Sequence, residues 1–247
     1  MRLTVVGCAG SFPGPDSAAS CYLIEHDGHR ILLDLGSGAL GPLQLHTQLE
    51  RVEAVVLSHL HPDHCLDLTG LDVARTYHGP QPPPELLVLG PPDTAARLRR
   101  ASEVSEGSAR HTSFTIREHV PVTEVGPFRI RTVAVVHPVP AYATRIEAGG
   151  RTLVYSGDTA PTQALVEMAK GADLALFEAT WFEGDDNPPG LHLTGTQAGR
   201  HAAAAEVGRL VLTHLVPGRD QDRTRQEAAA HYSGELTLAA AAASYDI

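Results

Sequence analysis

Lysine, cysteine and long apolar runs are all scarce in this chain of 247 residues. Lys170 is the single lysine, and the 29 acidic side chains outnumber the 19 basic ones, so the formal net charge is −10. An acidic protein repels a phosphate backbone, so a long nucleic acid is not expected as a partner. A small anion drawn to a local positive charge, such as a metal centre, remains compatible with this composition.

No apolar run approaches the roughly 20 residues that span a bilayer, so no membrane partner is expected. The N-terminal MRLTVVGCAG reads as a short strand that ends in glycine, without the apolar core and cleavage site of a signal peptide. Cys8, Cys21 and Cys65 form neither a CxxC pair nor an even disulfide framework. We therefore expect a cytoplasmic protein whose thiols are buried and reduced.

The remaining composition is that of an ordinary globular protein, with 43 % hydrophobic and 19 % charged residues. Strand-like apolar runs are expected at 3–6, 21–25, 31–33, 54–57, 86–89, 114–117, 128–136, 144–147, 152–155, 174–177 and 210–212. Helices are expected at 66–77, 94–103, 163–170, 196–207 and 221–231, with breaks at 79–84 and 184–190. This order predicts two sheets packed face to face with helices outside.

The most informative segment is 55–64, Val-Val-Leu-Ser-His-Leu-His-Pro-Asp-His. Its apolar start predicts a buried strand that ends at Leu57. His59 and His61 alternate along the chain that follows, so an extended backbone directs both imidazoles to the same side. A His-rich surface loop without a ligand is the alternative, but imidazoles at this spacing directly after a buried strand favour a metal site.

The same segment then changes direction. Pro62 turns the chain, so that Asp63 and His64 begin the next helix and approach from another side. One short loop can thus present ligands to two adjacent metal ions. Imidazole nitrogen and carboxylate oxygen together suit zinc, with manganese and iron as alternatives.

Three later positions repeat the order of apolar strand, ligand-type residue and loop. His137 follows Val-Ala-Val-Val, Asp158 stands in Tyr-Ser-Gly-Asp-Thr, and His214 follows Leu-Val-Leu-Thr. Each one alone fits a helix cap, a turn aspartate or a core histidine. A site of two metals needs roughly four ligands for each ion, so together with the first cluster these residues indicate a binuclear centre.

HLHPDH, a lone histidine, SGDT and a final strand-terminal histidine resemble the ordered motifs of the metallo-β-lactamase superfamily. Asp34, in Leu-Leu-Asp-Leu-Gly, resembles the family's first motif, a structural aspartate below the site. The resemblance covers nearly the whole chain. It implies a four-layer αββα sandwich, a single domain over 1–247 built of two similar halves of about 1–120 and 121–247.

The resemblance also implies a ligand for every position of two divalent metal ions, most simply Zn²⁺. His61 stands where the iron-binding flavodiiron relatives typically place glutamate, which favours the zinc hydrolase branch. The implied ligands are His59, His61 and His137 for the first ion, Asp63, His64 and His214 for the second, and Asp158 as a bridge.

A two-metal site lowers the pKa of a bridging water, so we expect hydrolysis by attack of a metal-bridging hydroxide, with Asp63 orienting it. The branch that resembles tRNA 3′-processing endonucleases adds a HEAT…HxT…A pattern. Phe-Glu178-Ala-Thr and His192-Leu-Thr match it, which makes His192 the implied proton donor or transition-state ligand and Glu178 its orienting carboxylate. The alternative is a buried hydrogen-bonding glutamate and an unrelated loop histidine.

The chain departs from tRNA-processing relatives, which insert a long basic arm between the lone histidine and SGDT. It also resembles actinobacterial phosphodiesterase-like relatives in its PGPDS, SHLHPDH, YSGDT and DNPPGLHLTG stretches. We therefore expect a phosphodiesterase acting on small phosphodiesters such as cyclic nucleotides. Arg145 and Arg219 are candidate phosphate contacts, and Trp181 and Phe182 are candidates to stack on a base, each with a purely structural alternative.

Two other functions fit the same residues. One is an ester, thioester or lactone hydrolase with the same metals, and the other is a metal-binding or sensor module without catalysis. A homodimer is plausible for the family, although no interface is visible in the sequence. The other histidines are expected to be surface or structural residues, among them His26, His46, His78, His111 and His201.

Overall fold

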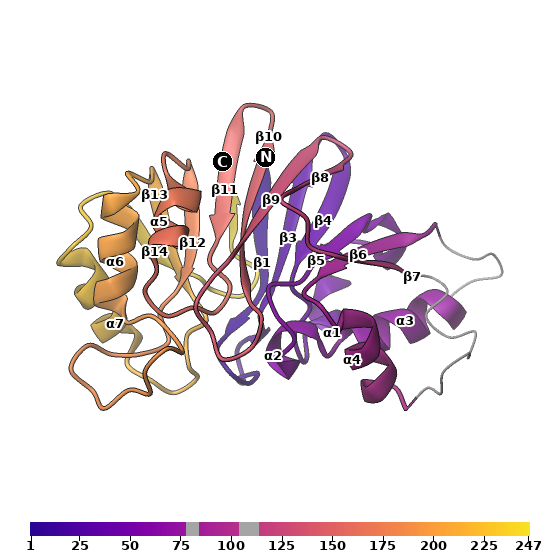
Figure 1. The fold of residues 1–247 in the computed structure, drawn as a ribbon, viewed down its shortest axis with the longest axis horizontal. Helices are drawn as coiled ribbons and strands as arrows, with labels where there is room; N and C mark the ends of the chain where they lie inside the picture. Colours follow the sequence, from indigo (N-terminus) through magenta and orange to yellow (C-terminus); the bar gives the residue numbers. More distant parts are fainter. Residues whose placement is uncertain (78–83, 104–113) are drawn as a thin grey trace.

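The computed structural model describes residues 1–77, 84–103 and 114–247, in which two β-sheets pack face to face between layers of helices (Figure 1). The first sheet has the order β15-β1-β3-β4-β5-β6-β7, with β2 beside β1. Its strands are β1 (Arg2–Ala9), β2 (Ala18–Ala19), β3 (Cys21–His26), β4 (His29–Leu33), β5 (Ala54–Val56), β6 (Leu86–Gly90), β7 (Phe114–Glu118) and β15 (Ser244–Asp246).

The second sheet has the order β14-β13-β12-β11-β10-β9-β8. Its strands are β8 (Val122–Val125), β9 (Phe128–Ala134), β10 (Tyr142–Ala148), β11 (Arg151–Tyr155), β12 (Leu174–Glu178), β13 (Arg209–Thr213) and β14 (Glu235–Leu238). In both sheets an antiparallel part passes into a parallel part, from β4 to β7 and from β11 to β14. The parallel strands of each set therefore end at one edge of their sheet.

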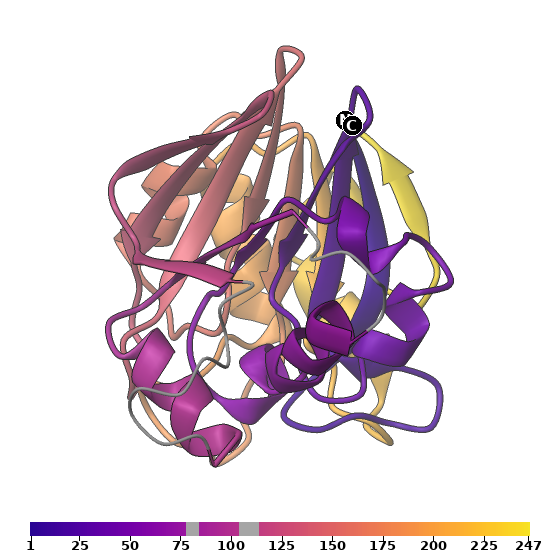
Figure 2. The same cartoon turned by 90° about the vertical axis from the view of Figure 1, so that its right-hand side faces the viewer.

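Helices cover the outer face of each sheet, as Figures 1 and 2 show from two sides. On the first sheet they are α1 (Leu40–Leu43), the 3-10 turn η1 (Leu49–Arg51), α2 (Pro62–Cys65), α3 (Leu68–Tyr77) and α4 (Thr94–Ala101). On the second they are α5 (Gln163–Ala169), α6 (Gly195–Ala204) and α7 (Gln221–Ala229). The predicted αββα sandwich is confirmed.

Apolar side chains from both sheets form the central core. Phe128 and Ile146 of the second sheet and Ile24 and Ile31 of the first are fully buried there. Two further cores lie between each sheet and its helices. Because alternate residues of a strand face opposite sides, a strand buried on both faces reads as a continuous apolar run, which is why these strands are visible in the sequence.

The chain ends meet at one side of the molecule (Figure 2), where the amide of Ile247 bonds the carbonyl oxygen of Met1. β15 pairs antiparallel with β1, so the C-terminal segment adds a strand to the sheet built by the N-terminal part. The expected division into two similar halves near residue 120 stays a prediction.

All eleven predicted strands are present, with ends that differ by at most three residues. The short strands β2, β8, β14 and β15 were not predicted, because β8, β14 and β15 lie at or beside sheet edges and are only partly buried. The helix predicted at 66–77 begins two residues later, at Leu68. The segment before it forms a separate helix, α2, which ends at Cys65. The helix expected to reach 103 ends at Ala101, since Glu103 takes φ 51°. Of the break at 79–84, residues 79–83 lie outside the described residues.

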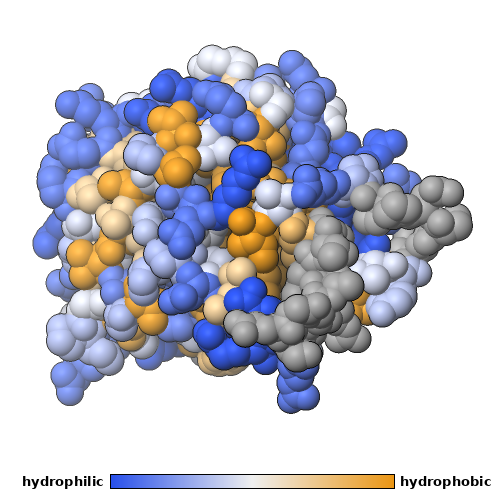
Figure 3. All heavy atoms as spheres, turned by 45° about the vertical axis from the view of Figure 1, so that its right-hand side comes forward, coloured by the Kyte–Doolittle hydropathy of each residue, from blue (hydrophilic) through white to orange (hydrophobic). Residues whose placement is uncertain are grey.

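The face in Figure 3 is largely hydrophilic, with hydrophobic side chains showing in several separate places. In the part of the chain that the structure describes, no helix combines the length and the apolar character that crossing a membrane would need.

Candidate metal centre

The predicted ligands follow strands that end at the same edge of the two sheets, the lower edge in Figure 1. β5 ends two residues before Ser58-His59, β11 ends three residues before Asp158, and β13 ends immediately before His214. Since each strand is buried, its C-terminal end fixes where the next residues lie. The edge therefore collects side chains that are up to 155 positions apart in the sequence.

Three imidazoles form the first cluster: His59, His61 and His137. Nδ1 of His61 lies 3.0 Å from Nε2 of His59 and 3.3 Å from Nε2 of His137. Ligand atoms held at about 2.0 to 2.1 Å in a tetrahedron around zinc lie roughly 3.3 Å apart. The three nitrogens are thus spaced as ligands of one ion.

Four buried groups form the second cluster: Asp63, His64, Asp158 and His214. Nε2 of His214 lies 3.3 Å from Nε2 of His64 and 3.2 Å from Oδ2 of Asp63. Nε2 of His64 lies 3.3 Å from Oδ1 of Asp158. These separations again suit the donors of a single ion.

Asp158 lies between the two clusters. Its Oδ2 is 3.7 Å from Nε2 of His59 in the first cluster and 3.5 Å from Nε2 of His214 in the second. Its Oδ1 is buried and accepts no hydrogen bond among the described residues, although Nε2 of His64 lies 3.3 Å away. A buried carboxylate oxygen without a partner is costly, and a bound cation removes that cost. The residues present therefore fit a pair of divalent ions.

Asp34 contacts the second cluster through His64, in agreement with its expected role as a structural aspartate. It is fully buried, and its Oδ2 lies 2.7 Å from Nδ1 of His64. The amide of Ser58 donates to its Oδ1 at 2.6 Å, and the hydroxyl of Tyr155 donates to its Oδ2 at 2.8 Å. With Nδ1 engaged in this way, His64 presents Nε2 to the second cluster.

Two other imidazoles are held in the same manner by their Nδ1. Nδ1 of His137 donates to the carbonyl oxygen of Leu191 at 2.9 Å. Nδ1 of His214 lies 2.8 Å from Oγ1 of Thr180. Each contact leaves the lone pair on Nε2, and the amide of Ser11 donates to that atom of His214 at 3.2 Å. The side chains are thus preset for binding through Nε2.

Glu178 and His192 form a pair beside the second cluster. Glu178 ends β12, is fully buried, and its Oε1 accepts from Nδ1 of His192 at 3.0 Å. The backbone amide of Thr159 and the hydroxyl of Thr180 also donate to this carboxylate, at 2.7 Å each. With His214, the two residues form a third group of donors that could hold a cation.

Charge at the centre follows from burial and from the carboxylates. Burial lowers the pKa of His59, His61 and His137, which favours the neutral imidazole, the form that can bind a metal. Burial also lowers the pKa of His192, but the charge and hydrogen bond of Glu178 outweigh it and raise that pKa to about 9. The imidazole of His192 therefore carries a proton at neutral pH.

The two arginines that were candidate phosphate contacts lie in different surroundings. Arg145 does not join the cluster, because its guanidinium bonds the Glu147 carboxylate and the carbonyl oxygens of Met168 and Lys170. Arg219 lies over the rings of Trp181 and Phe182, at 5.2 and 5.3 Å from their centroids. Of the histidines expected to be structural, His201 caps the turn before α5 through Thr162, and His78 and His111 lie outside the described residues.

Sequence reasoning gave no role to Ser58, Tyr155 and Thr180, which hold the ligands in place. Each stands within three residues of a predicted ligand or of Glu178, so adjacency to the motifs is the signal that could have found them. Their hydroxyls meet partners from distant parts of the chain, such as Asp34 and His214. Only the fold determines those contacts.

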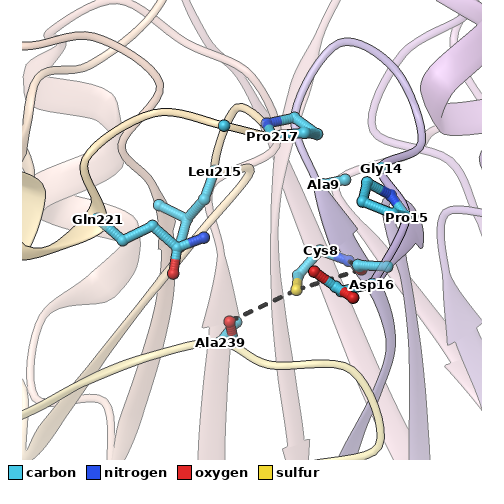
Figure 4. Close-up of a pocket in the computed structure, with 11 residues that line it drawn as sticks. Cys8, Ala9, Gly14, Pro15, Asp16, Leu215, Pro217, Gln221 and Ala239 are labelled. Atoms are coloured by element: carbon cyan, nitrogen blue, oxygen red, sulfur yellow. Dashed lines mark hydrogen bonds between the residues drawn. The ribbon is translucent and has the colours of Figure 1, made fainter.

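A separate cavity of about 120 Å³ lies behind the loop that follows His214 (Figure 4). It is lined by Cys8, Asp16, Leu215 and Gln221, among others, and by none of the residues of the two clusters. Sγ of Cys8 lies 3.5 Å from the carbonyl oxygen of Ala239, and burial raises the pKa of this thiol. The cavity is thus distinct from the two ligand clusters.

Comparison with known proteins agrees with this geometry. Residues 29–215 match the β-lactamase superfamily domain. An uncharacterized protein of Mycobacterium leprae is 44 % identical, with all of this chain and 89 % of that one covered. The probable metallo-hydrolase YhfI of Bacillus subtilis is 33 % identical over 97 % of both chains. Ribonuclease Z of Shouchella clausii is 29 % identical, covering 93 % of this chain and 92 % of that enzyme.

The crystal structure of YhfI, a metallo-β-lactamase fold protein, superposes on this chain with a TM-score of 0.89 at 31 % identity, covering 99 % of each. The fold, the His and Asp clusters able to bind metal, and the relatives lead to one conclusion. This chain belongs to the β-lactamase superfamily and is one of its metallo-hydrolases.

Proposed function

We propose that the protein is a binuclear phosphodiesterase of small phosphodiesters such as cyclic nucleotides. The observation that carries the proposal is the pair of Glu178 and His192. It places a protonated, 7 % exposed imidazole beside the second metal cluster, with its Nδ1 fixed and its Nε2 left for a substrate. Cleavage of a phosphodiester needs such a donor, because the departing alkoxide is a poor leaving group without a proton.

The residues divide the reaction between them. His59, His61, Asp63, His64, His137, Asp158 and His214 would hold two divalent ions, most simply Zn²⁺, which would supply a water of lowered pKa and polarise a phosphoryl oxygen. Asp63 accepts a hydrogen bond from the attacking water and orients it toward phosphorus. The water gives one proton to solvent, and as its oxygen bonds to phosphorus, the P–O bond of the leaving group breaks and that leaving oxygen takes the proton from Nε2 of His192. Glu178 holds the resulting imidazole in place.

Two features favour a small substrate. The net charge of −10 opposes a long phosphate backbone. The lone histidine, His137, is followed directly by β10, with only residues 138–141 between them, so no arm for a large RNA extends from this point. Ribonuclease Z, a relative at 29 % identity, acts on RNA by its name, which supports phosphodiester chemistry on this scaffold. We propose the same bond type in a smaller molecule.

The first test is hydrolysis of bis(p-nitrophenyl) phosphate and of 2′,3′- and 3′,5′-cyclic nucleotides by metal-reconstituted protein, with Asp63→Ala in parallel. We expect turnover in the wild-type protein and none in the variant, since Asp63 is a ligand and the group that orients water. The metal content of both proteins is measured, so that loss of the ion and loss of orientation are separated. Two bound metals without any turnover would contradict the proposal.

His192→Ala distinguishes the phosphodiesterase from an ester, thioester or lactone hydrolase with the same metals. We expect kcat on cyclic nucleotides to fall by roughly 10²- to 10⁴-fold, the usual contribution of a general acid. Cleavage of bis(p-nitrophenyl) phosphate should fall less, because p-nitrophenolate leaves without a proton. A variant that keeps full turnover on cyclic nucleotides would show that His192 is not the donor.

The cytoplasmic location of the protein and its oligomeric state both stay predictions. All three cysteines are free and buried, which is compatible with the reducing cytoplasm that we propose. The homodimer also stays a prediction, to be checked by light scattering.

A further inference from the structure

Arg219 is an exposed arginine beside the metal centre that is not neutralised by a carboxylate among the described residues. It lies five residues after His214, and its Nη1 has one contact, 3.5 Å from the carbonyl oxygen of Thr180. Among the residues that the structure describes, no carboxylate forms an ion pair with it. Arg223, on the following helix, is by contrast bound to Asp185 and Glu227 at 3.0 and 3.1 Å.

Trp181 connects this arginine to the candidate catalytic pair. Cζ of Arg219 lies 5.2 Å from the centroid of the Trp181 ring. The same ring meets His192 edge to face, with centroids 5.2 Å apart. The amide of Trp181 also donates to the carbonyl oxygen of Leu193, so indole and imidazole are held on neighbouring segments. Arg219, Trp181 and His192 therefore form one continuous row that ends at the proposed proton donor.

The ring of Phe182 is not available as an alternative surface on which a ligand could stack. Its side chain is only 8 % exposed, and the guanidinium of Arg223 lies 4.2 Å from its ring centroid. Arg219 itself covers the ring from another position, at 5.3 Å. Of the planar groups in this row, the guanidinium of Arg219 belongs to the most exposed residue, whereas Trp181 and His192 are only partly exposed.

An exposed guanidinium held over an indole ring is a platform for a flat aromatic group. Arginine stacks its plane on bases and rings, which a lysine cannot do, because the ammonium is a point charge. Stacking on such groups tolerates any base and adds to the binding of the phosphate. Because the row leads to His192, a base that stacks on Arg219 would direct its own phosphate along the row toward the metal centre.

We propose that Arg219, supported by Trp181, is the specificity-determining contact for the base of a nucleotide substrate. The inference rests on the proposed phosphodiesterase function and narrows its substrates to phosphodiesters that carry a nucleobase.

Fluorescence provides a direct binding test, because Trp181 is the single tryptophan of the chain. Metal-loaded protein is titrated with adenosine 5′-monophosphate, and with ribose 5-phosphate as the ligand without a base. We expect a saturable change in tryptophan emission with the nucleotide and a much smaller one with the sugar phosphate. Arg219→Ala should weaken nucleotide binding by about 5- to 150-fold, the range of stacking energies converted to affinity.

Kinetics test the same contact with a matched pair of substrates. Thymidine 5′-(p-nitrophenyl phosphate) and methyl p-nitrophenyl phosphate share the leaving group, and the methyl ester lacks both the base and the deoxyribose. We expect Arg219→Ala to lower kcat/KM for the thymidine ester by about 5- to 150-fold relative to the methyl ester. Arg219→Lys should behave like the alanine variant. Arg200→Ala, which removes an exposed arginine on α6, is the control.

The outcomes separate this inference from the function on which it rests. Wild-type protein that cleaves neither ester would overturn both. Wild-type protein that cleaves both, with equal losses in the Arg219 variants, would overturn the base contact alone. Full rescue by Arg219→Lys would also overturn it, since Arg219 would then act through charge on the phosphate.

Discussion

At the scale of single residues, the centre depends on side chains that position the ligands. Asp34 takes a left-handed backbone conformation, φ 57°, which is unfavourable for a side chain with a Cβ. It is held there by the amide and hydroxyl of Ser58, the hydroxyl of Tyr155 and the ring of His64. These partners fix the carboxylate, and the carboxylate fixes the direction of His64 toward the metal position.

Asp34→Asn removes the charge that orients His64 but keeps the shape of the side chain. We expect zinc affinity at the second cluster to fall by about 10- to 100-fold, as is usual when a partner of a ligating histidine is changed. Competition with a chromogenic chelator measures this affinity. Tyr155→Phe, which removes one donor to the same carboxylate, should cause a smaller loss. Unchanged zinc binding in Asp34→Asn would show that His64 is held by its packing alone.

At the scale of elements, α6 shows how a local signal places a functional loop. Thr194 begins the helix with a capping box: its hydroxyl accepts from the amide of Gln197 at 3.1 Å, and the Gln197 side chain accepts from the amide of Thr194 at 3.0 Å. The helix then lies close to α7, because Gly195 and Gly199 have no side chain; a Cβ on either would lie 2.5 Å from a carbonyl oxygen of α7. His192 stands two residues before this fixed start.

Thr194→Ala removes the cap of α6. We expect the free energy of unfolding to fall by about 1 kcal/mol, the typical value of a lost N-cap, because one amide at the start of the helix loses its acceptor. Urea denaturation followed by circular dichroism measures the change. Thr194→Ser keeps the hydroxyl and should retain most of the stability. Equal losses in both variants would assign the effect to the methyl group of the threonine.

At the scale of the whole molecule, the metal centre joins the two sheets. The loop after β5 of the first sheet supplies His59 to His64, whereas His137, Asp158 and His214 follow strands of the second sheet. Several buried carboxylates and imidazoles also meet there in a protein of net charge −10. Divalent cations would offset that negative charge and tie the two sheets together.

Removal of metal is therefore expected to destabilise the entire fold. A ligand present at 100 times its Kd stabilises the native state by about 2.7 kcal/mol for each site. Treatment with a chelator should thus lower Tm by several degrees, and zinc should restore it. Thermal unfolding of chelated and reconstituted protein, with metal content measured for each, gives the comparison. An equal Tm in the two forms would mean that the clusters are fully ordered without metal.

The sequence alone predicted the central strands and the order of the ligand-type residues along the chain. Both are local properties: a strand buried on both faces needs an apolar run, and a ligand that follows it is visible beside that run. Edge strands such as β8 and β14 left no such pattern, because one side of each is exposed. The resemblance to a family supplied the assignment of Asp34, Glu178 and His192.

The tertiary structure decided which of these residues meet. Asp158 contacts His59 and His214 because parallel strands end at a common edge, a property of the sheets that no segment contains by itself. The contacts of Thr180 with His214, and of Arg219 with Trp181, likewise depend on packing between distant loops. Residue types and their order are properties of the sequence itself. Distances between side chains that are far apart in the sequence are set only when the two sheets pack against each other.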